Sequence, residues 1–262
     1  MKILKWLAIV VVLLLVVGVG VTWIFFDPLV SGAIEKGSTY ATGVDTKVAH
    51  VSASPVAGKF GLQGLTLANP PGFRDEPFVS LGSARAGWQN GTLLSNTIEM
   101  DEFVVEDVTV NLERANGKTN YGTILDHLSQ MSGGKPEPEK KKEPEKAQKN
   151  LRIKKIEIKN VRATLYLPNL PSIPVTVPSI VINDFRSDGS TTEIVGQLTS
   201  EVLHSILDSV LKAGKDVFPA DIVKDLGNGL KNVGDVFGSG AKDAAKGVQD
   251  ALKSAGDLFK KK

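Results

Sequence analysis

MKILKWLAIVVVLLLVVGVGVTWIFF, residues 1–26, opens the chain and is expected to decide where the rest of it resides. The run from Trp6 to Phe26 contains no charged residue. About 20 such residues, rising about 1.5 Å each, cross a hydrocarbon core about 30 Å thick, so the run predicts a membrane-spanning helix. Aromatic side chains near both ends of a span favour the membrane interface. The expected interface anchors are Lys2, Lys5, Trp6, Trp23, Phe25 and Phe26.

A cleaved signal peptide is the alternative interpretation of the same residues. Its apolar region is usually about 7–15 residues long and ends at a small-x-small cleavage site. The run here is longer, and bulky neighbours make Gly18-Val19-Gly20 a poor cleavage site. An uncleaved anchor is therefore expected. Because the two lysines precede the span, the N-terminus is predicted to be cytoplasmic and the bulk of the chain to lie across the membrane.

The composition limits what the exported part can be. A chain of 262 residues predicts one soluble domain with appendages. A net charge of +2 does not favour nucleic acid as a partner. Without cysteine, the chain has no disulfides and no thiolate metal sites, so its stability must come from a packed core.

Alternating apolar residues predict a mainly antiparallel β-sheet after a short helix over residues 27–43. Within 59–69 the alternation changes phase at Gly64, where a β-bulge is expected. Prolines on either side of 175–177 mark that segment as an edge strand. The nine predicted strands are 44–53, 59–69, 78–88, 97–103, 107–112, 151–158, 163–167, 175–177 and 180–185.

Three further segments have other patterns. Residues 120–131 predict a short helix, and a wide apolar stripe predicts a long one that Thr191 or Thr192 caps and that ends near Ala213. Residues 133–150 contain one apolar side chain, Ala147, which indicates a disordered charged linker. The Gly-rich stretch 214–262 is expected to be an amphipathic or mobile helical tail, either on a membrane surface or loosely packed.

The predicted fold is α+β: a single N-terminal transmembrane helix, a curved, mainly antiparallel sheet, a covering helix and C-terminal amphipathic helices. The anchor occupies 1–26, a β-rich part 27–132, the linker 133–150, and strands with the long helix 151–213. At about 4.8 Å per strand, nine strands form a sheet only about 40 Å wide.

Chemical motifs are scarce in the sequence. His50, His127 and His204 fall in separate predicted elements, and none has a partner at metal-ligand spacing. The sequence also contains no nucleophile elbow, phosphate loop or dinucleotide fingerprint. We therefore expect no enzymatic activity, no catalytic residues, no cofactor and no metal.

Four phrases, in a fixed order behind the apolar run, resemble the N-terminal region of the AsmA family. They are GLTLANPPGF at Gly64–Phe73, PFVSLGSARAGW at Pro77–Trp88, NTIEMDEFVVEDVTVNLER at Asn96–Arg114 and NGKTNYGTIL at Asn116–Leu125. The resemblance extends over roughly residues 1–130. It implies a bacterial inner-membrane protein that faces the periplasm. It also implies a β-rich groove related to bridge-like lipid-transfer proteins, with a role in lipid homeostasis of the envelope and outer membrane.

Long members of that family repeat their strands into an extended groove, whereas a sheet of about 40 Å is too short to bridge an envelope. Lipid binding or hand-over at the inner membrane is then the expected function. The alternative is an anchored scaffold or envelope-stress protein that acts through protein contacts, in line with the charged linker and the C-terminal helices. The candidate lipid-facing positions, which an ordinary core under the 191–213 helix explains as well, are Phe60, Leu62, Leu65, Leu67, Ile98, Met100, Val108 and Val110.

Overall fold

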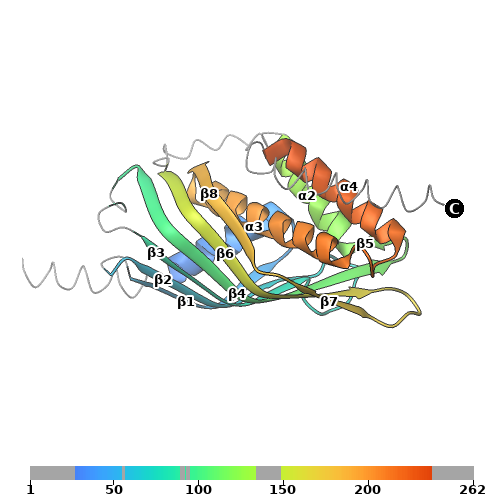
Figure 1. Cartoon of the computed structure of the whole chain (residues 1–262). Coiled ribbons are helices and arrows are strands. Elements are labelled where there is room, and N and C mark those ends of the chain that lie inside the picture. The colour runs from blue at the N-terminus through green and yellow to red at the C-terminus, as the bar shows by residue number, and fades with distance from the viewer. Residues whose placement is uncertain (1–26, 55–56, 89–91, 93–94, 134–148, 238–262) are drawn as a thin grey trace, which may run out of the picture.

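The computed structural model describes residues 27–54, 57–88, 92, 95–133 and 149–237. Eight strands form one mixed sheet that curves around the helices (Figure 1). Its order is β1-β2-β3-β4-β6-β7, with β8 on β6 and β5 on β4. The strands are β1 (Thr46–Ser54), β2 (Lys59–Leu67), β3 (Val79–Trp88), β4 (Thr97–Ala115), β5 (Lys118–Thr119), β6 (Lys149–Tyr166), β7 (Ile173–Val177) and β8 (Ile180–Gly189).

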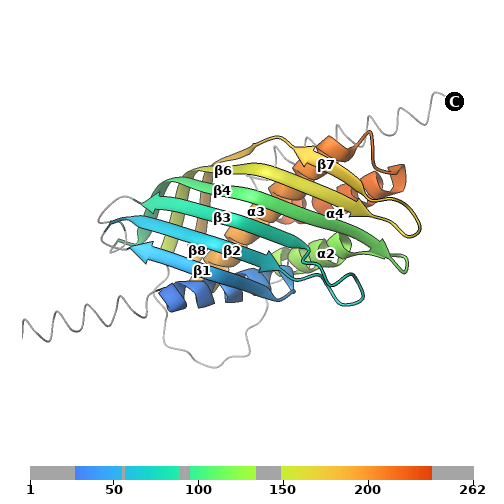
Figure 2. The same cartoon turned by 90° about the horizontal axis from the view of Figure 1, so that it is seen from below.

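The helices lie on one side of the sheet, so the view from below shows its outer face bare of them (Figure 2). They comprise residues 27–42, α2 (Asn120–Gly133), α3 (Thr191–Gly214) and α4 (Ala220–Phe237). All pairings along the sheet are antiparallel except β4 with β6, which is parallel. A parallel pair needs a crossover, and α2 with the segment after it makes that connection. The α+β fold with a curved, mainly antiparallel sheet is therefore confirmed.

Strands β4 and β6 repeat the same apolar pattern at a constant offset of 53 residues. In each strand the inward face shifts by one residue twice, so that the inward apolar positions fall at intervals of two, three, two and three. Leu62 and Leu67 in β2 show one such shift, which Gly64 makes with a φ of 63°. The bulge predicted at Gly64 is confirmed.

The shifts of neighbouring strands line up across the sheet. One row of residues, one from each of five neighbouring strands, runs across the sheet without regular strand pairing. The residues before and after each member pair in register with the next strand, and three members have positive φ. Such a row bends all the strands at the same level, which curves the sheet. The row consists of Ala49, Gly64, Gly82, Asp107 and Asn160.

The prediction of separate strands at 97–103 and 107–112 was wrong, because they form one continuous strand, β4. The same is true of 151–158 and 163–167 in β6. The loss of alternation at Asp107 and Asn160, with φ of 61° and 54°, indicates a bend within a strand and not its end. The sheet therefore contains eight strands in the described residues.

The helix of residues 27–42 seals the free edge of β1. Three of its side chains accept hydrogen bonds from β1 backbone N–H groups: Asp27 from Ala53 at 2.9 Å, Glu35 from Val48 at 2.9 Å and Thr39 from Thr46 at 3.1 Å. An edge whose N–H groups are occupied in this way is protected from pairing with another sheet.

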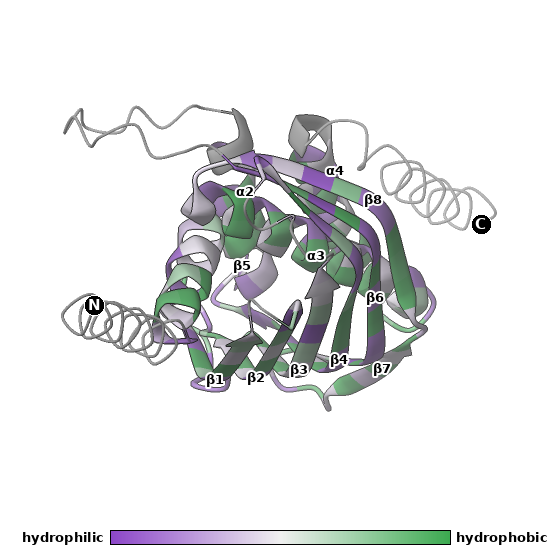
Figure 3. Cartoon of the chain, turned by 90° about the vertical axis from the view of Figure 1, so that its left-hand side faces the viewer, coloured by the Kyte–Doolittle hydropathy of each residue, from purple (hydrophilic) through white to green (hydrophobic). Residues whose placement is uncertain are grey.

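The same helix also contacts α3. Gly37 lies so close to α3 that an added Cβ would meet the Cβ of Val195 at 2.6 Å, and Ser38 bonds Thr199 at 2.9 Å. Sheet, helix 27–42 and α3 thus form a ring in cross-section, visible end-on in Figure 3.

Other boundaries differ from those predicted. Ser190, and not Thr191 or Thr192, caps α3, because its side chain accepts from Glu193 N–H in a capping box. Gly133 belongs to α2 and Lys149–Asn150 to β6, so the predicted linker is too long at both ends. Its remaining residues, 134–148, lie outside the described residues. Within the predicted tail, 220–237 form α4, and its apolar side is buried against α2 and α3.

The predicted transmembrane anchor, residues 1–26 with its interface side chains, lies outside the described residues, as does 238–262 of the tail. Among the helices that the structure describes, none combines the length and apolar character that crossing a membrane requires.

Candidate functional site

The inner face of the sheet is built from apolar rungs, each formed by paired residues of successive strands. All eight predicted positions belong to the same apolar core or pack against it. Leu62, Leu67, Val108 and Val110 are at most 4% exposed. The other four, Phe60, Leu65, Ile98 and Met100, are only partly buried.

Burial divides this face into two parts. Toward the β5 and β7 end, the rungs are fully covered by α2, α3 and α4. Toward the opposite end, α3 covers β6 and β8 but the inward residues of β2, β3 and the start of β4 keep exposed surface. We call these residues the open patch: Phe60, Ala86, Trp88, Ile98, Met100 and Phe103.

Register joins the members of the open patch. Phe60 pairs with Ala86, which pairs with Phe103, while Trp88 pairs with Met100. Side chains at directly paired positions share a face and contact each other. Ala86 and Trp88 are two residues apart in β3, so the two paired rows are neighbours on the same face, and Ile98 lies two residues before Met100 in β4.

The outer face of the sheet has the opposite character. Ion pairs cross neighbouring strands, including Arg85 with Glu106 at 2.6 Å and Lys154 with Asp101 at 2.6 Å. The Lys155 Nζ lies 3.1 Å from a carboxylate oxygen of Glu102 and 3.1 Å from one of Glu157, and its hydrogen bond lowers the pKa of the Glu157 carboxyl. A solvated outer face and an apolar inner face leave the inner face as the candidate surface for an apolar ligand.

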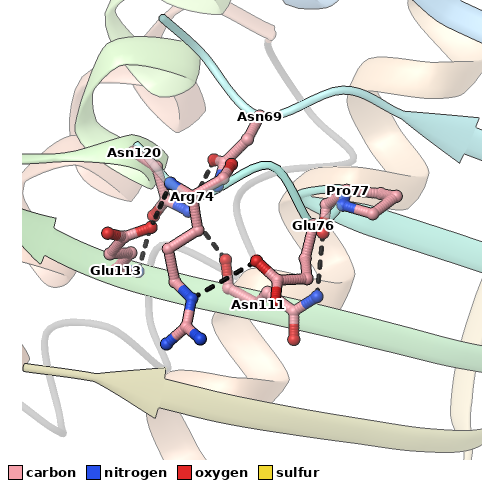
Figure 4. A network of polar contacts seen from close by, with 7 residues as sticks. All are labelled: Asn69, Arg74, Glu76, Pro77, Asn111, Glu113 and Asn120. Carbon is pink, nitrogen blue, oxygen red and sulfur yellow. Dashed lines mark hydrogen bonds and ion pairs between the residues drawn. The ribbon is translucent and has the colours of Figure 1, made fainter. Parts of the chain in front are cut away.

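The phrases that carry the family resemblance meet in one polar network (Figure 4). Asn120, which is fully buried, donates to Asn69 Oδ1 at 2.9 Å and to the Asn111 carbonyl at 2.7 Å. Its own Oδ1 accepts from Glu113 N–H and Tyr121 N–H, both at 2.8 Å. The network ties the loop after β2 to β4 and to the start of α2, so its role is structural.

Arg74 extends this network to the surface. Its backbone N–H donates to the Glu113 carboxylate at 2.9 Å, and its guanidinium lies 4.3 Å from the centre of the Tyr166 ring. The Asn111 side chain donates to the Pro77 carbonyl at 2.8 Å. These contacts hold the loop between β2 and β3 across β4 and β6.

A second candidate site is an open polar cleft of about 850 Å³ between α2, α4 and the β4–β5 turn. Arg114 of β4 forms an ion pair with Asp221 of α4, which holds the pKa of that carboxyl below its usual range. Burial raises the pKa of Tyr121, whose hydroxyl donates to Asp225 at 3.2 Å. Acidic and basic groups balance in the lining, which includes Lys118, Asp126, His127, Gln130, Lys224, Asn228 and Asn232.

Neither site has the chemistry of a metal centre: within the described ranges, no cluster of histidine and carboxylate ligands could hold a metal ion. Sequence inspection missed Ala86, Trp88 and Phe103 in the open patch. Alternation within the predicted strand 78–88 could have indicated the first two. The cleft could not be predicted, because its walls come from residues about 100 positions apart in the chain.

A curved sheet with a charged outer face, an apolar inner face and helices covering part of it defines an α+β protein with an open, mixed sheet. The sequence profile of the AsmA family matches residues 1–167, so the chain belongs to the AsmA family. This membership is consistent with a role in the cell envelope and in lipid homeostasis. A search of curated proteins gave no match.

Proposed function

We propose that this AsmA-family chain is a non-enzymatic, membrane-anchored envelope protein that binds lipids by one acyl chain on the open patch. The observation that carries the proposal is the partial exposure of six apolar positions, five of them paired with one another, on the inner face of an otherwise well-packed sheet. Apolar burial contributes about 25 cal/mol per Å² and does not depend on direction, so such a surface accepts acyl chains of different types.

The position of the patch relative to the N-terminal run supports delivery from a membrane. Asp27, the first residue after the run, bonds Ala53 N–H, and Ala53 pairs with Phe60 of the patch. Leu29, on the first turn of the same helix, is 70% exposed. With residues 1–26 as a bacterial inner-membrane span and the N-terminus cytoplasmic, the patch stands beside the periplasmic membrane surface.

Coverage of the other half of the face argues for carrying and not for bridging. At the β5 and β7 end the rungs are closed by α2, α3 and α4, and Leu112, Leu165 and Leu211 there are completely buried. An acyl chain that enters at the open patch therefore meets packed protein side chains part of the way along the sheet. The protein would hold lipid at one membrane and hand it to another component.

Lipid extraction and native mass spectrometry of the full chain, expressed in a bacterial membrane and purified in mild detergent, test the proposal. The expected result is co-purified acyl lipid that is lost in Ala86→Glu, which introduces a charge into the open patch. Arg85→Ala, the adjacent outer-face position, should keep the lipid. Absence of lipid from the unmodified chain, with none taken up from added vesicles, would contradict the proposal.

The polar cleft favours a second function, docking of a protein partner. Its balanced charges and amide side chains suit the polar rim of a protein contact more than an acyl chain. Crosslinking in cells from a photoreactive residue at Asn228 should then give a discrete protein adduct. If only lipid adducts form there, this second function is wrong.

A further inference from the structure

Trp88 differs from the other members of the open patch because it carries a hydrogen-bond donor. Its indole Nε1 is shielded from water and has no acceptor in the part of the chain that the structure describes. Leaving a buried donor unpaired is costly, and native structures seldom retain such groups without a reason.

The backbone fixes where this side chain sits. Trp88 ends β3 just after a register shift and pairs with Met100 of β4. Its backbone N–H donates to the Gly58 carbonyl at 3.0 Å. Met100 packs against the apolar core, so the indole shares the inner face with it. The side chain that carries the unpaired N–H therefore borders the surface on which an acyl chain would lie.

The surroundings determine which acceptor fits. The patch neighbours of Trp88 are apolar, and bringing an ionised phosphate or carboxylate among them is far more costly than bringing a neutral carbonyl. An ester carbonyl is covalently attached to the start of the acyl chain and arrives with it. It accepts one hydrogen bond without adding charge.

We propose that Trp88 Nε1–H donates to the ester carbonyl oxygen of a bound acyl lipid and thereby selects acyl esters over chains without a carbonyl. This inference rests on the proposed lipid-binding function and adds the part of the ligand that the site recognises. Trp88 acts as a specificity-determining residue, because burial of the lipid's hydrocarbon chain supplies affinity whether or not the carbonyl is present.

A comparison of ester and ether lipids tests the inference. The full chain in mild detergent is mixed with equal amounts of a diacyl phosphatidylethanolamine and its dialkyl ether analogue, and occupancy is read by native mass spectrometry. A net hydrogen bond contributes about 0.5–1.5 kcal/mol, so the unmodified chain should prefer the ester roughly two- to twelvefold. Trp88→Phe keeps an aromatic side chain and removes the donor, and its ester-to-ether occupancy ratio should fall to about one.

A second readout keeps Trp88 and so does not depend on the folding of Trp88→Phe. In a Trp6→Phe, Trp23→Phe background, Trp88 is the one remaining tryptophan. Ultraviolet resonance Raman should then report a hydrogen-bonded indole with the diacyl lipid and an unbonded one with the ether lipid. Equal ester and ether occupancy in the unmodified chain would overturn the role of Trp88 while leaving lipid binding intact. Failure of both lipids to bind would overturn the proposed function and this inference together.

Discussion

The side-chain amide of Asn160 in β6 donates to the carboxylate of Asp107 in β4 across 3.1 Å, and both residues have positive φ. They face each other in the row where neighbouring strands shift phase together. Asparagine and aspartate tolerate this left-handed backbone better than other non-glycine residues. The pair therefore bends two long strands at one level without ending either of them.

Asn160→Val should destabilise the fold by about 1–2 kcal/mol, because a β-branched residue is strained at positive φ. Asn160→Gly, which relieves the backbone and loses only an exposed hydrogen bond, should stay within about 0.5 kcal/mol of the unmodified chain. Chemical denaturation of both variants gives the comparison. Equal destabilisation would mean that the hydrogen bond matters and the backbone conformation does not.

This bend also explains which parts of the fold could be predicted from the sequence. Strand positions were largely predictable, since alternation survives on both sides of each shift. The continuity of β4 and β6 was not predictable, because a shift in the apolar alternation at Asp107 looks the same in sequence as the end of a strand. At Gly64 the glycine itself indicated the bulge, whereas aspartate and asparagine are also common in ordinary turns.

The candidate site was partly predictable for a related reason. Inner-face membership follows from alternation, so Phe60, Ile98 and Met100 could be identified in advance. How much of each residue remains exposed depends on where α3 and the helix of residues 27–42 cross the sheet. That placement arises from contacts such as Gly37 with Val195, far apart in the chain, and local patterns do not contain it.

Asn120→Ala should lower the free energy of unfolding by more than about 2 kcal/mol. Truncation removes the side chain that serves Glu113 N–H, Tyr121 N–H and the Asn111 carbonyl, and buried groups left unpaired cost about 1–3 kcal/mol each. Asn228→Ala, at an exposed position of α4, is the matched control and should change stability by less than about 0.5 kcal/mol. Similar values for the two variants in thermal or urea unfolding would show that the network does not hold the loop.

Ser190→Ala should destabilise the protein by about 1 kcal/mol, because the capping box at the start of α3 is lost. Thr191→Ala, one residue further on, should be nearly neutral. Urea denaturation of the two variants distinguishes the cap that the structure shows from the caps predicted by sequence. A larger effect at Thr191 would restore the original prediction.

Glu201→Gln should stabilise the protein at neutral pH. Burial on α3 raises the pKa of the Glu201 carboxyl, so the folded state binds its proton more tightly than the unfolded chain does. The resulting stability is fully present below the unfolded pKa of about 4.3 and is lost as pH rises through the higher folded value. Glutamine carries no charge at any pH and avoids this loss.

The advantage of Glu201→Gln should accordingly be greatest near pH 7–8 and shrink toward zero below about pH 4. Urea denaturation between pH 3.5 and 8 measures it, with Asp126→Asn, an exposed position of α2, as control. An advantage that does not vary with pH would show that side-chain packing, and not the buried charge, accounts for the difference.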